Sequence, residues 1–69
     1  MHIDNTNCYR FLRDKAAYAI ESRNLNLMYE AYGMAEMARW LGHITQEEFM
    51  DLNEKLVRNG INRPGSYDN

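Results

Sequence analysis

The feature that most constrains the fold is a short junction in the middle of the chain, where one helix stops and another starts. Gly42 suits the left-handed conformation that ends many helices. Thr45 and Glu48 have the spacing of a capping box, in which each side chain accepts a hydrogen bond from the other residue's backbone amide. Ile44 before the cap and Phe49 after it are spaced to form a hydrophobic staple. The junction therefore predicts a tight corner between two helices.

Apolar residues recur at helical spacing on both sides of this corner, and the pattern predicts three helices. Their expected ranges are about 6–22, 25–41 and 46–59. The inward face of the first helix is expected to carry Cys8, Phe11, Leu12, Ala16, Ala19 and Ile20. The inward face of the second is expected to carry Leu27, Ala31, Met34, Ala35, Ala38 and Leu41. The third is expected to turn Phe49, Leu52, Leu56 and Val57 inward.

The beginning of the chain contains two further helix signals. Asn5 or Thr6 is expected to cap the first helix, because either side chain can accept a hydrogen bond from a free amide of the opening turn. The pattern then breaks at residues 22–24, which are compatible with a loop or with a kink, and Asn24 is suited to cap the second helix.

Residues near the end of the chain indicate where the helical domain ends. Gly60 fits a left-handed helix end, after which Ile61 is expected to fold back on Leu56. Residues 1–61 are therefore interpreted as a single helical domain, and residues 62–69, which have turn composition, as a flexible C-terminal tail.

Length and composition leave few ways to stabilise this domain. Sixty-nine residues form one domain, and a chain of this size buries only roughly 60% of the surface that its unfolded form exposes. Cys8 is the sole cysteine, so no internal disulfide exists, and His2 and His43 do not have metal-ligand spacing. Ile and Val are scarce, whereas Ala, Leu, Met, Glu and Arg favour helix. The expected fold is all-α, a small three-helix bundle or a helical hairpin with an extra N-terminal helix, without metal or cofactor.

An enzymatic or membrane-bound function is not expected. No histidine lies near Cys8 in sequence to activate its thiol, and no glycine-rich phosphate loop exists, so the chain is not expected to be an enzyme. No run of about 18 apolar residues is present, and the start of the chain does not resemble a signal peptide. The expected location is the cytoplasm.

The corner also raises an alternative function, a DNA-binding helix-turn-helix regulator that uses residues 38–57. Ala38 and Gly42 have the Ala-x-x-x-Gly spacing of such motifs. However, the net charge is −2 without a basic stripe, and the helix that would read DNA is acidic. Its outward residues are expected to be Gln46, Glu47, Asp51 and Glu54. Binding to nucleic acid is therefore not favoured.

Residues 41–56 resemble the helical hairpin of short SHOCT-type domains, whose pattern has a Leu, a Gly, an Ile-Thr, two Glu and a Phe. The resembling residues are Leu41-Gly42-His43-Ile44-Thr45-Gln46-Glu47-Glu48-Phe49, followed by Leu52 and Leu56. The chain differs from that family in lacking a Lys-rich second helix. As a whole it is also similar to small accessory proteins of phages and prophages. That resemblance implies a cytoplasmic protein, made in an infected cell, that binds and modulates a host or phage protein.

Aromatic and methionine side chains are more numerous than three short helices can bury, and such residues are enriched at protein interfaces. The expected partner-binding residues are Tyr29, Tyr32, Met37 and Trp40, on a second apolar stripe of the middle helix. The leading hypothesis is a non-enzymatic protein-protein interaction module. Because a large exposed apolar stripe usually marks an interface, we also expect a homodimer.

Overall fold

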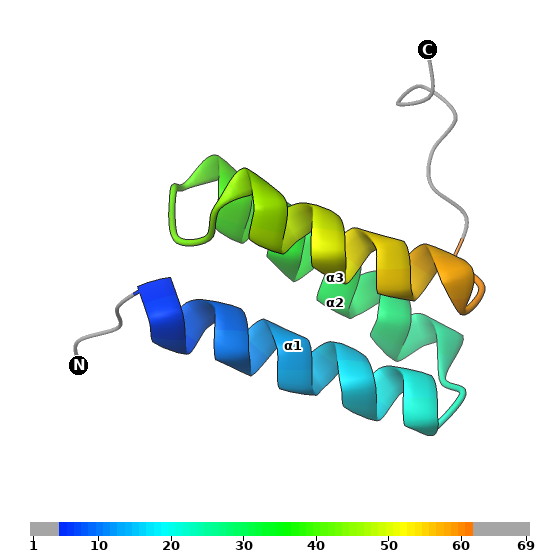
Figure 1. Ribbon diagram of the computed structural model, residues 1–69. Helices are drawn as coiled ribbons and strands as arrows, with labels where there is room; N and C mark the ends of the chain where they lie inside the picture. Colours follow the sequence, from blue (N-terminus) through cyan, green and yellow to red (C-terminus); the bar gives the residue numbers. More distant parts are fainter. Residues whose placement is uncertain (1–4, 62–69) are drawn as a thin grey trace, which may run out of the picture.

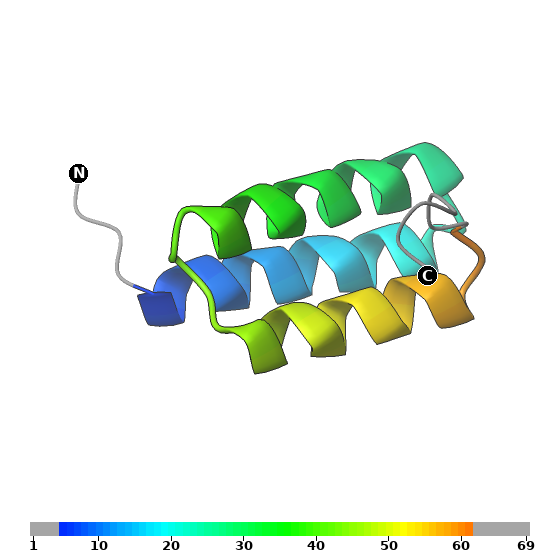
Figure 2. The same cartoon turned by 90° about the horizontal axis from the view of Figure 1, so that it is seen from above.

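The computed structural model describes residues 5–61, which form three α-helices. These are α1 (Asn5–Glu21), α2 (Leu25–Trp40) and α3 (Gln46–Arg58). Helices α1 and α3 run in one direction and α2 runs in the other, so that the chain goes up, down and up (Figures 1 and 2). The described residues contain no strand, which confirms the all-α fold and the three predicted helices. The predicted tail over 62–69 and the predicted capping side chains of Asn5 and Thr6 lie outside what the structure describes.

The break after α1 is a loop rather than a kink. Arg23 takes a left-handed conformation with φ 53°, and the Asn24 amide donates to the Ala19 carbonyl at 3.0 Å. This pattern ends a helix by satisfying its last free carbonyls. The Asn24 side-chain oxygen then accepts from the Leu27 amide at 3.1 Å and caps α2, as predicted.

The predicted corner between α2 and α3 is confirmed. Gly42 has φ 84°, beyond the reach of most side chains, and ends α2. The Thr45 hydroxyl accepts from the Glu48 amide at 3.0 Å, and the Glu48 carboxylate accepts from the Thr45 amide at 2.9 Å. Ile44 is buried and Phe49 packs against the core, which holds the corner on the bundle.

The end of α3 also agrees with its prediction. Gly60 has φ 126°, and the Ile61 amide donates to the Leu56 carbonyl at 3.2 Å. Ile61 and Leu56 are both buried, so the chain folds back on the last turn of the helix.

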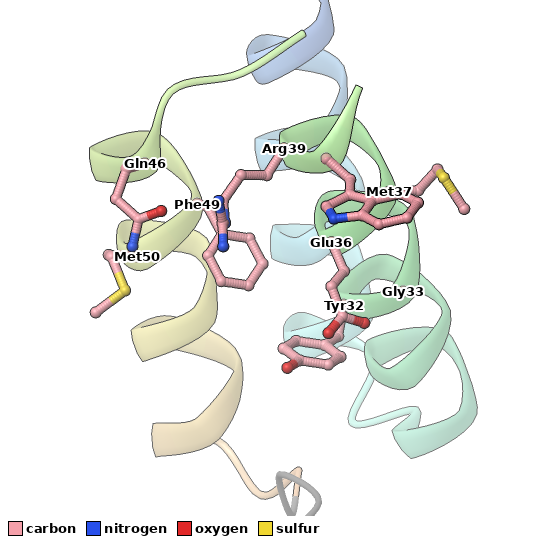
Figure 3. Close-up of a pocket in the computed structure, with 9 residues that line it drawn as sticks. Tyr32, Gly33, Glu36, Met37, Arg39, Gln46, Phe49 and Met50 are labelled. Atoms are coloured by element: carbon pink, nitrogen blue, oxygen red, sulfur yellow. The ribbon is translucent and has the colours of Figure 1, made fainter. Parts of the chain in front are cut away.

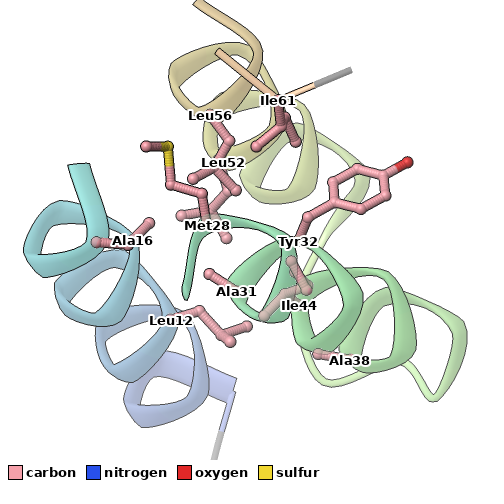
Figure 4. Close-up of a cluster of buried hydrophobic side chains, with 12 residues drawn as sticks. Leu12, Ala16, Met28, Ala31, Tyr32, Ala38, Ile44, Leu52, Leu56 and Ile61 are labelled. Carbon is pink, nitrogen blue, oxygen red and sulfur yellow. The ribbon is translucent and has the colours of Figure 1, made fainter. Parts of the chain in front are cut away.

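The core lies where the three helices meet (Figure 4). Its buried apolar residues are Leu12, Ala16, Ala19, Met28, Ala31, Tyr32, Ala35, Ala38, Ile44, Leu52, Leu56 and Ile61. Small residues predominate in α1 and α2, so these two helices can approach closely. Larger side chains from α3 and its flanking segments fill the opposite side of the core.

Four residues that were expected to face inward are exposed instead, and three that were not expected there, Met28, Tyr32 and Asn53, are buried. Phe11 lies 100° around α1 from the buried Leu12, and its side chain is exposed. On α2 the buried face lies between α1 and α3, so Met28 is buried whereas Met34 is exposed. Leu41 and Val57 are also exposed, at the edges of their helices.

None of the described helices is both long and apolar enough to cross a lipid bilayer.

Candidate functional site

A groove of about 550 Å³ runs between α2 and α3 (Figure 3). We call it the α2/α3 groove. Its lining residues are Tyr32, Gly33, Glu36, Met37, Arg39, Trp40, Gln46, Phe49 and Met50. In Figure 3, Phe49 and the Arg39 side chain lie between the two helices, with Met50 and Gln46 on α3 and Met37 on α2. The corner at Gly42 and the capping box of α3 hold the two walls at this spacing.

The rim of the groove exposes large apolar side chains to solvent. The Trp40 side chain is 83% exposed, that of Met37 55% and that of Met50 50%. Tyr29, one turn before Gly33 on α2, is also exposed. An apolar surface of this kind usually marks a binding site, because its burial releases ordered water.

The predicted binding residues are only partly brought together. Met37 and Trp40 line the groove, and Tyr29 continues the same ridge of α2. Tyr32 was expected on the exposed surface but is only 8% exposed, because it lies on the flank of α2 that faces α3. Phe49 and Met50 complete the groove from α3, although the sequence analysis did not include them in the site. The sequence signal that could have identified them is the pair of adjacent apolar residues, Phe49 and Met50, soon after the corner.

Aromatic and cationic contacts stiffen the floor of the groove. The rings of Tyr32 and Phe49 lie 6.1 Å apart between centroids, in a tilted arrangement. The Arg39 guanidinium carbon lies 5.4 Å from the centroid of the Phe49 ring, within the range of a cation–π interaction. These contacts connect the α2 and α3 walls across the floor of the groove.

Gly33 gives the groove part of its depth. A Cβ atom at this position would meet no atom within 4 Å, so no contact inside the described chain requires glycine there. An exposed glycine inside a helix costs about 1 kcal/mol of stability relative to alanine. The packing of this chain alone therefore does not account for the residue.

Two opposite charges lie along one flank of the groove. Glu36 and Arg39 both line it, one helical turn apart on α2. Within the described part of the chain, neither side chain makes an ion pair. Glu36 is therefore available to a charge on an incoming surface. The Arg39 guanidinium lies over the Phe49 ring but has no carboxylate partner among the described residues.

Comparison of the chain with models of known protein families, with curated proteins and with solved structures found no match. The similarity of residues 41–56 to SHOCT-type hairpins, and that of the whole chain to phage accessory proteins, remain predictions.

A smaller hollow continues the groove along α3, and the two share Met50. Its other lining residues are Asn53, Glu54, Val57 and Arg58. Asn53 is only 5% exposed, and its side-chain oxygen has no hydrogen-bond partner among the described residues. Such a buried, unpaired oxygen is costly to the folded state.

On the opposite side of α3, a polar contact fastens it to α1. The Tyr9 hydroxyl donates to an Asp51 carboxylate oxygen at 2.9 Å, and Lys55 lies 3.3 Å from the same carboxylate. The hydrogen bond from Tyr9 lowers the pKa of Asp51, and the Lys55 charge lowers it further. Burial and the bond to Asp51 raise the pKa of the Tyr9 hydroxyl.

Cys8 and His43 are the side chains that the sequence offers as candidates for chemistry. Burial, followed by the charge of Glu48, raises the pKa of the Cys8 thiol, so the nucleophilic thiolate is disfavoured. His43 is exposed in the corner. Among the described residues, no three His, Cys, Asp or Glu side chains gather as a metal site would require.

The face of α3 that would meet DNA in the alternative function is dominated by paired charges. Arg58 lies 2.6 Å from Glu54, and Lys55 is paired with Asp51. Glu47 is exposed in the first turn. Cations already paired with carboxylates are poor ligands for a phosphate backbone, so this surface does not favour the DNA-binding alternative.

Proposed function

We propose that the protein is a non-enzymatic interaction module that acts by binding another protein molecule through the α2/α3 groove and its apolar rim. The observation that supports this proposal most strongly is the exposure of Trp40 beside the α2/α3 groove. Tryptophan is among the residues that contribute most to binding energy at interfaces, and leaving it in water is unfavourable. Met37 and Met50 supply adaptable apolar surface around it.

The biological setting that we propose is that of a phage or prophage accessory protein, which binds and modulates a host or phage protein in the cytoplasm. The exposed apolar side chains beside the groove support a role in binding.

Photo-crosslinking in the cells that naturally carry the chain tests this function. The photoreactive residue p-benzoylphenylalanine replaces Trp40 at the groove or, as a matched control, the exposed Glu21 at the end of α1. We expect light-dependent protein adducts from position 40 and few from position 21. A second substitution, Met37→Asp, should reduce the adducts from position 40 while the helical circular dichroism is retained. Absence of adducts at position 40, or equal yields at both positions, would overturn the proposal.

A further inference from the structure

We infer that the occupant of the α2/α3 groove is the same groove of a second copy of this chain, related by a two-fold axis. The inference rests on the proposed interaction surface and names its partner. A two-fold interface requires one patch to be complementary to itself in shape and in charge. The surface around Trp40 meets both requirements.

The shape of the patch combines a projection with a recess. The exposed Trp40 indole forms the rim of the same groove that Phe49 and Met50 line from α3. In a face-to-face pair, each Trp40 lies over the groove of the other copy, so one arrangement covers two exposed indoles and two apolar grooves. A partner with only a projection or only a recess would leave one of these features exposed.

The charges of the patch complement each other when the two α2 helices run antiparallel. Glu36 and Arg39 lie three residues apart, which places them about 60° apart around the axis of α2 and on the same flank. A two-fold axis that lies in the interface, perpendicular to α2 and level with the midpoint between Met37 and Ala38, places the second α2 antiparallel to the first and keeps this flank on the same side. Glu36 of each copy then lies beside Arg39 of the other, and two ion pairs form across the interface.

Gly33 fits the same arrangement. It lies on the groove side of α2, one turn from Met37, where an absent side chain leaves room for the surface of the second copy. Close approach of the second copy explains why glycine stands at this position, although it costs helix stability that no contact within the monomer offsets. Gly33→Ala should therefore stabilise the isolated helix while it weakens the dimer.

The test uses charge reversal in the full chain, read by sedimentation equilibrium at tens of micromolar protein. The unaltered chain is expected to show twice the 8.2 kDa of one copy. Glu36→Arg alone and Arg39→Glu alone each place like charges together, and each should weaken association by at least about tenfold. An equimolar mixture of the two variants brings opposite charges together again and should restore the dimer. Glu21→Arg, which makes the same charge change far from the groove, is the matched control and should leave the dimer unchanged.

The outcomes separate this inference from the proposed function. Rescue in the mixture supports the antiparallel pairing, because a variant that had merely lost its fold would not recover. Failure of rescue between variants that keep their helical circular dichroism would overturn it. If the unaltered chain is monomeric but still forms adducts with a different protein at position 40, the homodimer inference is wrong and the proposed binding function is supported. A monomeric chain without such adducts would overturn both.

Discussion

At the residue scale, Asn53 is a buried polar residue whose hydrogen bonding is incomplete. Its amide oxygen has no partner among the described residues and lies next to the hollow that continues the groove. Leucine has the same branched shape and the same number of side-chain heavy atoms, and it removes the unsatisfied group. Its larger methyl groups can extend into the adjacent hollow, so Asn53→Leu should raise the free energy of unfolding by about 1–2 kcal/mol. Urea unfolding at low protein concentration measures this change.

The control for this substitution is Asn26→Leu, at an exposed asparagine of α2, which should change stability by no more than about 0.5 kcal/mol. Loss of stability in Asn53→Leu would contradict the expectation and would indicate that the amide has a partner in solution.

A second residue-scale prediction concerns pH and the hydrogen bond from Tyr9 to Asp51. The folded pKa of Asp51 is lowered from 3.8, so this carboxylate stabilises the fold above that pH. The contribution is lost as the pH falls through the folded pKa. Tyr9→Phe removes the hydrogen bond and should raise the pKa of Asp51, as measured by carbon-13 NMR titration of its carboxyl group. The stability deficit of this variant, present near about pH 7, should shrink as the pH falls below 3.8.

Tyr18→Phe is the matched control, because Tyr18 is 62% exposed on the same helix. Its effect should not depend on pH in this range. An unchanged Asp51 titration in Tyr9→Phe would show that the bond does not set this pKa.

At the scale of the elements, the helix ends were the most predictable part of the structure. The corner from Gly42 to Glu48 and the end at Gly60 depend on contacts between residues a few positions apart, which the sequence displays directly. The local rules for capping and left-handed ends therefore suffice there.

The orientation of the faces was less predictable, and α2 shows why. Apolar residues lie on almost every side of this helix, so periodicity alone allows several inward faces. Which one is buried depends on where α1 and α3 pack, and this placement buries Met28 and Tyr32 rather than Met34 and Leu41. The groove was only half predicted for the same reason, since its α3 wall arises from tertiary packing.

The corner itself gives the element-scale prediction. Thr45→Ala removes the cap of α3 and should lower the free energy of unfolding by about 1 kcal/mol. Thr45→Ser keeps a hydroxyl at the same position and should recover most of this loss, whereas Gln46→Ala at the exposed neighbouring residue should have little effect. Thermal and urea unfolding measure all three, and an unaffected Thr45→Ala would show that the capping box does not stabilise the corner.

At the scale of the whole molecule, this small bundle has limited means of stabilisation. Its core is thin, its single cysteine forms no internal disulfide, and the α2/α3 groove with its exposed apolar rim stays open to water in the monomer. Association through the groove would convert that exposed surface into an interface and would link folding to protein concentration. The rim of the groove would then serve both the stability of the chain and its proposed binding function.

Trp40 is the single tryptophan of the chain, so its fluorescence reports directly on the groove. The decisive experiment measures two properties of its fluorescence, the emission maximum and the quenching by acrylamide. Both are followed as the protein concentration rises from below about 1 micromolar to above about 100 micromolar. The account predicts a blue shift and increasing protection from acrylamide, because the second copy covers the indole. An emission typical of a water-exposed indole, fully quenchable at every concentration, would contradict it.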